Sequence, residues 1–387
     1  MIYLDNAATT WPKPPCVVKA VNEALIRYGA NPGRSGHRMS LQTAEMIYRC
    51  REKVAAFFGL SDAQGVVFTA NCTTAINMVI RGIVGTEGRV LISDMEHNAV
   101  WRTVNALPFG VRYDMAAWLD NDDETVDNFR RMITKDTRLI VCTHASNVFG
   151  NVLPIARLSA LAHEHGIPLC VDAAQSAGVL SIDMQRDGID YLCVAAHKGL
   201  YAPTGIGILL CGTRLPLNPI ISGGTGNASL SPYQPEELPE RLESGTVNVS
   251  GIAGISAGLD FLSNRGREAI YRHEIGLLQG LYDSLVECEG VQLYMDRPTL
   301  ERSVPVLSVN IDGLSSEQAA AMLDNMGVAV RAGLHCAPLA HKRFGTLPQG
   351  TVRIAPSAFT QPGEIKTVCK LFSQFSQNKL HMRKNMI

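Results

Sequence analysis

The stretch Tyr191–Leu210, YLCVAAHKGLYAPTGIGILL, decides the fold class that we expect for this chain. A short apolar run, Tyr191–Ala195, ends at His197 and Lys198, and a Gly/Pro turn leads into a second apolar run, Gly205–Leu210. A lysine after a buried strand is either a surface residue whose ammonium reaches water or a desolvated, partly neutral amine that can bond to a carbonyl.

A neighbouring apolar run favours the reactive amine. Ile167–Val171 leads directly into Asp172, within the sequence VDAAQSAG. An aspartate at the end of one strand and a lysine after a nearby strand are what pyridoxal phosphate requires. The lysine binds its aldehyde, and the carboxylate keeps its ring nitrogen protonated so that the ring can accept electrons.

These motifs resemble those of the fold-type I pyridoxal-phosphate enzymes in the class V aminotransferase branch, and within it the cysteine desulfurases. YLDNAATT, ESGTVN and RAGLHCAP are similar to that family as well, so the resemblance runs from Tyr3 to about Thr360. RAGLHCAP resembles the cysteine loop of the second desulfurase subgroup, which includes selenocysteine lyases. The serine-rich cysteine loop of the first subgroup is absent.

The alternation of expected strands and helices predicts an α/β fold with a mainly parallel, doubly wound sheet and ligands at the carboxyl edge of its strands. The resemblance implies a large cofactor domain at about 15–255. A smaller α+β domain at 1–14 and 256–387 would carry the reactive cysteine. Locally, we expect a short strand-like start at Tyr3–Thr10 and a loop at Asn121–Thr125.

Bulk properties exclude several classes of function. The chain has 387 residues and a formal net charge of −1, which argues against nucleic-acid and anionic-membrane partners. No apolar run reaches the ~18 residues of a membrane helix. The beginning, MIYLDNAATT, lacks the features of a signal peptide, and the ten cysteines are scattered, so we expect reduced thiols and a cytoplasmic location.

The resemblance also implies a set of cofactor contacts. Thr73 and Thr74 begin a predicted helix, where they are either ordinary caps or, together with the helix dipole, ligands of the cofactor phosphate. His97 would stack on the ring and shuttle protons, although a histidine in such a loop is, by itself, more often a surface or hydrogen-bonded residue than a catalytic one. The other implied contacts are Asn147 and Gln175 to the phenolic oxygen, His197 to the phosphate, and Thr246 to the phosphate of a neighbouring subunit.

Because Thr246 would serve a neighbouring subunit, the resemblance implies a homodimer with an active site shared across its interface. We expect no metal site. His163 and His165 lie two residues apart on a predicted helix, so they do not share a face.

Cys336 is the candidate nucleophile among the ten cysteines. A small buried thiol is the ordinary interpretation of a cysteine. Cys336, however, lies in a polar, glycine-containing loop, directly after His335 and near Arg331, and a positive charge on either residue would favour its thiolate. Arg353, in GTVRIAP, matches the family's arginine for the substrate carboxylate, and we also place Arg331 and Arg34 at the substrate.

The implied reaction converts L-cysteine to L-alanine. Lys198 removes the Cα proton, the Cys336 thiolate attacks the substrate sulfur, and the persulfide passes to an acceptor that can be another protein. A selenocysteine lyase or a cysteine sulfinate desulfinase would use the same residues. A non-catalytic paralogue that acts as a partner protein is the alternative of another class. Its only hint is Ala195, where the family usually has a phosphate-binding Ser or Thr.

Overall fold

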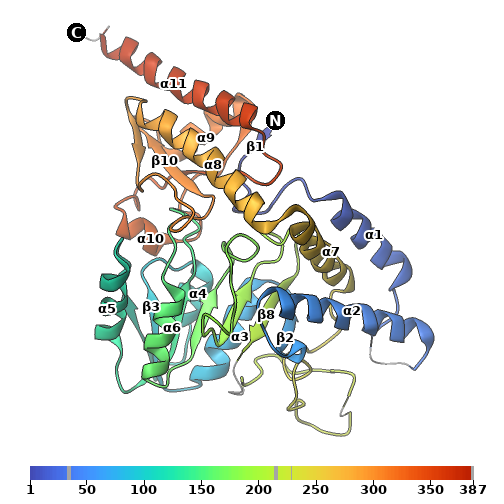
Figure 1. Cartoon of the computed structure of the whole chain (residues 1–387). Helices are drawn as coiled ribbons and strands as arrows, with labels where there is room; N and C mark the ends of the chain where they lie inside the picture. Colours follow the sequence, from blue (N-terminus) through green and yellow to red (C-terminus); the bar gives the residue numbers. More distant parts are fainter. Residues whose placement is uncertain (33–35, 213–216, 228, 385–387) are drawn as a thin grey trace. The chain divides into compact units, whose positions relative to one another are not determined.

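The structure, a computed structural model, describes residues 1–32, 36–212, 217–227 and 229–384 (Figure 1). The chain forms two compact units. The larger unit comprises Lys13–His144 and Leu153–Arg265, and the smaller unit comprises Met1–Pro12, Ala145–Val152 and Gly266–Ile387. The expected roles of a cofactor domain at about 15–255 and a second domain at 1–14 and 256–387 stay a prediction.

A seven-stranded sheet of order β2-β8-β7-β6-β5-β3-β4 forms the centre of the larger unit. β8 runs antiparallel to both of its neighbours, and the other adjacent pairs are parallel. The predicted α/β fold with a mainly parallel sheet is therefore confirmed. The strands are β2 (Val66–Thr69), β3 (Gly88–Ser93), β4 (Val111–Ala116), β5 (Thr137–Thr143), β6 (Leu169–Asp172), β7 (Tyr191–Val194) and β8 (Gly207–Cys211).

The helices of the larger unit explain why its central strands are almost uniformly apolar. Every residue of β6, β7 and β8 is buried, because helices cover strands in this kind of sheet. α3 packs on β5, β7 and β8, while α1 and α2 pack against α7. The helices are α1 (Pro15–Arg27), α2 (Arg38–Phe57), α3 (Cys72–Val84), α4 (Asn98–Asn105), α5 (Asp122–Met132), α6 (Ile155–Glu164) and α7 (Val249–Arg265), with a 3₁₀ turn at Ala63–Gly65.

Two local predictions are wrong. Residues 121–125 are not a loop, because α5 begins at Asp122. The side chain of Asn121 accepts hydrogen bonds from the N–H groups of Asp123 and Glu124, and the acidic first turn suits the positive end of the helix dipole. The initial strand β1 is only Ile2–Tyr3, since a hydrogen-bonded turn begins at Asp5.

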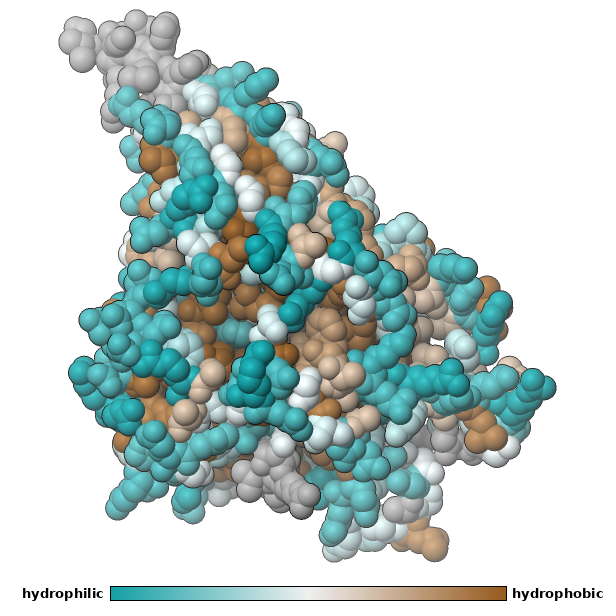
Figure 2. Space-filling view, viewed as in Figure 1, coloured by the Kyte–Doolittle hydropathy of each residue, from teal (hydrophilic) through white to brown (hydrophobic). Residues whose placement is uncertain are grey.

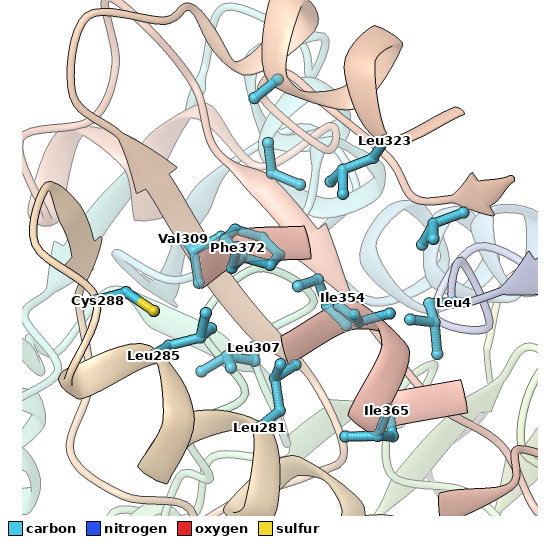
Figure 3. Close-up of a cluster of buried hydrophobic side chains, with 14 of the residues drawn as sticks. Leu4, Leu281, Leu285, Cys288, Leu307, Val309, Leu323, Ile354, Ile365 and Phe372 are labelled. Atoms are coloured by element: carbon cyan, nitrogen blue, oxygen red, sulfur yellow. The ribbon is translucent and has the colours of Figure 1, made fainter. Parts of the chain in front are cut away.

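The smaller unit has a three-stranded antiparallel sheet, β12-β10-β9, and a separate parallel pair, β1 with β11. Leu281 and Leu285 of α8, Leu307 of β10 and Phe372 of α11 meet in its apolar core (Figure 3). The elements are α8 (Arg267–Val286), β9 (Val291–Leu293), β10 (Leu307–Ile311), α9 (Ser316–Asn325), β11 (Val328–Ala329), α10 (Pro338–Arg343), β12 (Val352–Ile354) and α11 (Pro362–Lys384).

The surface of the larger unit is hydrophilic where α5 and α6 face solvent (Figure 2). α5 carries Asp122, Asp123 and Glu124 in its first turn and Arg130 and Arg131 in its last. Among the residues that the structure describes, no helix is long and apolar enough to cross a membrane.

Candidate active site

Lys198 lies in a hydrogen-bonded turn directly after β7. Its N–H donates to the carbonyl of Ala195 at 3.1 Å, and its own carbonyl accepts from the N–H of Tyr201 at 2.9 Å. Tyr201 has a positive φ of 58°, a conformation that is uncommon outside glycine. The ammonium of Lys13, the first residue of the unit, donates to the carbonyl of His197 at 2.7 Å. The backbone beside Lys198 is therefore fixed both by hydrogen bonds within the turn and by the Lys13 side chain.

Asp172 ends β6, the strand that pairs with β7, so the carboxylate and Lys198 share one edge of the sheet. The Asp172 side chain is buried, and its Oδ1 accepts from the N–H of Ala174 at 2.9 Å and the thiol of Cys72 at 3.6 Å. Burial raises the pKa of Asp172, while the Ala174 N–H, the Lys198 ammonium and the Cys72 thiol act in the opposite direction. The structure thus brings together the predicted acid and amine.

The N-terminus of α3 lies at the same edge. Asn71 caps this helix, because its Oδ1 accepts from both the N–H and the hydroxyl of Thr74, at 2.9 and 3.2 Å. Thr73 is exposed in the first turn, where helix N–H groups have no partner within the helix. A Cβ on Gly207 would lie 2.4 Å from the backbone carbon of Asn71, so only glycine lets β8 pass this close.

His97 and His197 of the larger unit are both predicted site residues, and different contacts set the protonation of each. Nδ1 of His97 accepts from the N–H of Ala99 at 3.0 Å and caps α4, so the proton of a neutral ring is on Nε2. Burial, followed by the charges of Lys198 and Lys13, lowers the pKa of His197 to about 4. His197 is therefore neutral near pH 7.

Glu96 is a buried acid that the sequence analysis missed. Its Oε1 accepts from the hydroxyl of Ser93 and, at 2.8 Å, from the N–H of Thr143. Among the described residues its other oxygen has no hydrogen-bond partner. Burial raises the pKa of Glu96 to about 8, so it is largely protonated at neutral pH. Its position directly before His97 was the only available signal.

Cys336 lies in the smaller unit, exposed, on a turn with unusual backbone geometry. His335 and Cys336 both have positive φ, 49° and 58°. Arg331 places Nη2 4.0 Å from the Cys336 sulfur. The expectation that His335 also supplies positive charge is wrong, because burial and the nearby charge of Arg353 lower its pKa to about 2. Arg331 is the cation in contact with Cys336.

Arg353 is almost completely buried in β12, with 1% of its surface exposed. Nη1 donates to the carbonyl of Asn147 at 2.9 Å, and Nη2 donates to Oδ1 of Asp5 at 2.8 Å. Within the described part of the chain, Nε has no hydrogen-bond partner. Among the described residues these bonds use two of the five guanidinium N–H groups, so donors are left for a further acceptor such as a carboxylate.

The remaining predicted residues lie in different surroundings. Asn147 belongs to the smaller unit, where its amide donates to the carbonyl of His335 at 2.7 Å. Gln175 lies in the turn after β6, and the exposed Thr246 hydroxyl accepts from the Asn31 amide at 3.3 Å. Arg34 lies outside the described residues. In the portion described, no group of three or more His, Cys, Asp or Glu is arranged to hold a metal ion.

The family model for aminotransferase class-V matches residues 2–368. This chain belongs to that family. It is 32% identical over 377 residues to a probable cysteine desulfurase of Methanothermobacter thermautotrophicus, covering 94% of this chain and 92% of the relative. It is 31% identical over 359 residues to a cysteine desulfurase of Haloferax volcanii, covering 89% and 83%.

Solved structures are similar to this class-V chain over nearly its full length. The apo cysteine desulfurase of Thermococcus onnurineus NA1 has a TM-score of 0.88 and 31% identity, covering 97% of this chain and 95% of that one. The cysteine desulfurase CsdA of Escherichia coli has a TM-score of 0.84 and 26% identity, covering 97% and 94%. The recognised family is therefore confirmed, and it is a family of pyridoxal-phosphate enzymes.

Proposed function

We propose that this chain is a pyridoxal-phosphate-dependent cysteine desulfurase that converts L-cysteine to L-alanine and collects the sulfur as a persulfide on Cys336. The observation that carries the proposal is the exposed Cys336 thiol on its turn, with the Arg331 guanidinium 4.0 Å away. An aminotransferase has no need of such a thiol, whereas sulfur transfer requires a nucleophile of this kind.

The residues at the sheet edge of the larger unit fit pyridoxal phosphate. Asp172 would hold the ring nitrogen, Lys198 the aldehyde, and the first turn of α3 with Thr73, Thr74 and neutral His197 the phosphate. Gln175 and Asn147 would contact the phenolic oxygen. When bound, the cofactor supplies an aldehyde and a protonated ring that stores electrons from the substrate. Ala195 offers no hydroxyl, and one lost hydrogen bond to a charged phosphate costs about 1.5–3 kcal/mol if no other donor replaces it.

The chain's own groups divide the reaction among them. Arg353 binds the substrate carboxylate, with Arg331 and Arg34 contributing positive charge. Lys198 would remove the Cα proton, and His97, protonated on Nε2, would transfer protons to and from the substrate. The Cys336 thiolate bonds to the substrate sulfur as the bond from that sulfur to Cβ breaks. The carbon keeps the electron pair and gains a proton, so alanine leaves and an acceptor thiol later takes the persulfide sulfur.

A homodimer completes the proposed site. The exposed hydroxyl of Thr246 would bind the phosphate of the neighbouring subunit, oriented by the Asn31 amide at 3.3 Å. The larger unit would then serve as the cofactor domain and the smaller unit as the domain of the nucleophile. We place the reaction in the cytoplasm, since its ten cysteines are free thiols and the reaction depends on a reduced one.

The test is release of alanine from purified holoenzyme incubated separately with L-cysteine, L-selenocysteine and L-cysteine sulfinate. We expect alanine and sulfide from cysteine, lost in Cys336→Ala and retained in Cys16→Ala, a matched control at another exposed thiol. Turnover of selenocysteine alone would make the chain a selenocysteine lyase, and turnover of cysteine sulfinate alone a desulfinase. Absence of alanine from every substrate, in protein that retains the cofactor, would contradict all three.

A further inference from the structure

The turn that carries Cys336 is held in an unfavourable backbone conformation. His335 and Cys336 are consecutive non-glycine residues with positive φ, and such residues persist only where the surrounding structure fixes them. The carbonyl of Leu334 accepts from the N–H of Ala337 at 2.9 Å, which closes the turn itself. One such bond does not offset two left-handed residues, so other contacts must hold the turn.

One set of contacts comes from the segment that leads into β12. Gly333 and Thr351 exchange two backbone hydrogen bonds of 3.1 Å. Nε2 of the buried, neutral His335 ring lies 3.0 Å from the Thr351 carbonyl, to which it donates. The Thr351 hydroxyl donates to Ser308 at 3.0 Å, and the Ser308 hydroxyl donates to the carbonyl of Val148 at 2.7 Å. The His335 side chain is thereby connected to the segment 145–152.

The same segment holds the His335 backbone directly. The amide of Asn147 donates to the His335 carbonyl at 2.7 Å, across 188 residues of sequence. The carbonyl of Asn147 accepts from Nη1 of Arg353 at 2.9 Å, and Arg353 is fixed in turn by Asp5. Asn147 itself is buried. One residue therefore contacts both the guanidinium and the turn of the nucleophile.

We propose that Asn147 is a positioning residue that links Arg353 to the Cys336 turn and keeps that turn in its left-handed conformation. This role depends on the proposed function in one respect. The link would fix the distance between Arg353, which binds the substrate carboxylate, and the Cys336 thiol, which takes the substrate's sulfur. The Asn147 amide has a second hydrogen, so a contact with the phenolic oxygen of the cofactor remains compatible with this role.

The first test measures backbone amide exchange of residues 331–338 in cofactor-free protein. Asn147→Ala removes the bond to His335, and we expect exchange in this segment to accelerate about tenfold, the factor that one lost hydrogen bond corresponds to. Gln279→Ala is the control, because the Gln279 side-chain amide likewise donates to a carbonyl of the smaller unit, that of Pro298, at 2.7 Å, and neither residue belongs to the segments that hold the turn. Unchanged exchange in Asn147→Ala, or equal acceleration in both variants, would overturn the proposal.

Asn147→Asp is the second variant, since it keeps the volume of the side chain and replaces the donor with an oxygen. We expect the same faster exchange, together with a kcat for L-cysteine at least tenfold below that of Gln279→Ala at equal thermal stability. A kcat that matches the control would refute the link even if exchange changes. If wild-type holoenzyme releases no alanine, the proposed function fails while the exchange result still judges whether Asn147 holds the turn.

Discussion

The sheet edge of the larger unit and the Cys336 turn of the smaller unit present their reactive groups by different means. Asp172 and Lys198 follow the ends of two neighbouring, regular, fully buried strands. Cys336 lies on a left-handed turn that depends on Asn147 and Thr351. The sheet edge is thus built by elements that would form without the reactive groups, whereas the turn is built by hydrogen bonds to specific side chains.

This difference teaches where a substitution should alter chemistry and where it should alter geometry. At the sheet edge, a reactive side chain can be removed while the strands that carry it stay paired. At the turn, removing a side chain that never touches substrate can still move the nucleophile.

Lys198→Ala should separate chemistry from folding at the sheet edge. We expect alanine release from L-cysteine to fall at least about 10³-fold, since in the proposed reaction the amine would both hold the cofactor and transfer the proton. The unfolding free energy of cofactor-free protein should change by less than about 0.5 kcal/mol, as at ordinary surface sites. Substrate turnover and urea unfolding provide the two measurements, with the exposed Lys53→Ala as control. Substantial residual turnover would show that another group is the base.

The sheet edge was largely predictable from the sequence, for a physical reason. Uniformly apolar runs mark buried strands, and the polar residues that end them mark the carboxyl edge, so the sequence alone predicts that Asp172 and Lys198 share that edge. What escaped prediction were Glu96 and Cys72. A buried acid and a thiol near the edge leave no periodic signature, and only their contacts reveal them.

For the turn, the sequence indicated which residues matter but not the backbone conformation that they adopt. Cys336 and Arg353 were found by resemblance, but positive φ at His335 could not be anticipated, because no glycine signals it. The charge assigned to His335 was wrong since its burial depends on Thr351 and Arg353, which come from another part of the chain. Contacts across 188 residues, as between Asn147 and His335, are set by the tertiary fold and not by local pattern.

The two regions should also differ in how pH affects stability. Burial raises the pKa of Glu96 from 4.5 to about 8, so the folded state keeps a proton that the unfolded state loses. The stability that this proton contributes is fully present below pH 4.5 and is lost as pH rises to 8, on the order of 5 kcal/mol in all. The pKa of His335 is lowered from 6.5 to about 2, so the unfolded state gains a proton there only below pH 6.5, and only then does His335 reduce the unfolding free energy. Between pH 6.5 and 8, His335 therefore does not add to the pH dependence caused by Glu96.

Glu96→Gln tests this by replacing the acid with a neutral side chain of the same shape. Relative to wild type, we expect its unfolding free energy to rise by about 2 kcal/mol between pH 6.5 and 8. Urea unfolding of cofactor-free protein at several pH values gives the difference directly. Parallel curves for the two proteins would mean that Glu96 is already ionised at pH 6.5. His335→Gln should run parallel to wild type over the same interval.

Arg353→Lys tests the β12 guanidinium that Asn147 connects to the Cys336 turn. Lysine keeps the charge, but its single nitrogen lacks the planar fork that donates to Asn147 and Asp5 from two separate nitrogens. We expect kcat/KM for L-cysteine to fall about 10- to 100-fold, corresponding to roughly 1.5–3 kcal/mol for a hydrogen bond to a charged group. Arg89→Lys, in the less buried pair with Asp114, is the control. Equal losses in the two variants would point to a general effect of the substitution.

Lys13→Met tests whether the sheet edge also relies on a long-range contact, which would narrow the contrast with the turn. The Lys13 ammonium donates to the carbonyl of His197, and burial lowers its pKa to about 8, so it is mostly charged at pH 7. We expect pyridoxal-phosphate affinity to fall about fivefold at pH 7, from loss of one charge-assisted hydrogen bond worth roughly 1 kcal/mol after partial solvation. Above pH 8 the wild-type amine loses its charge, so the two affinities should converge. Equilibrium dialysis at pH 7 and 9 measures the affinities of the wild type and the variant, with Lys53→Met as control. A difference in affinity that persists at pH 9 would assign the effect to packing of the Lys13 side chain and not to its charge.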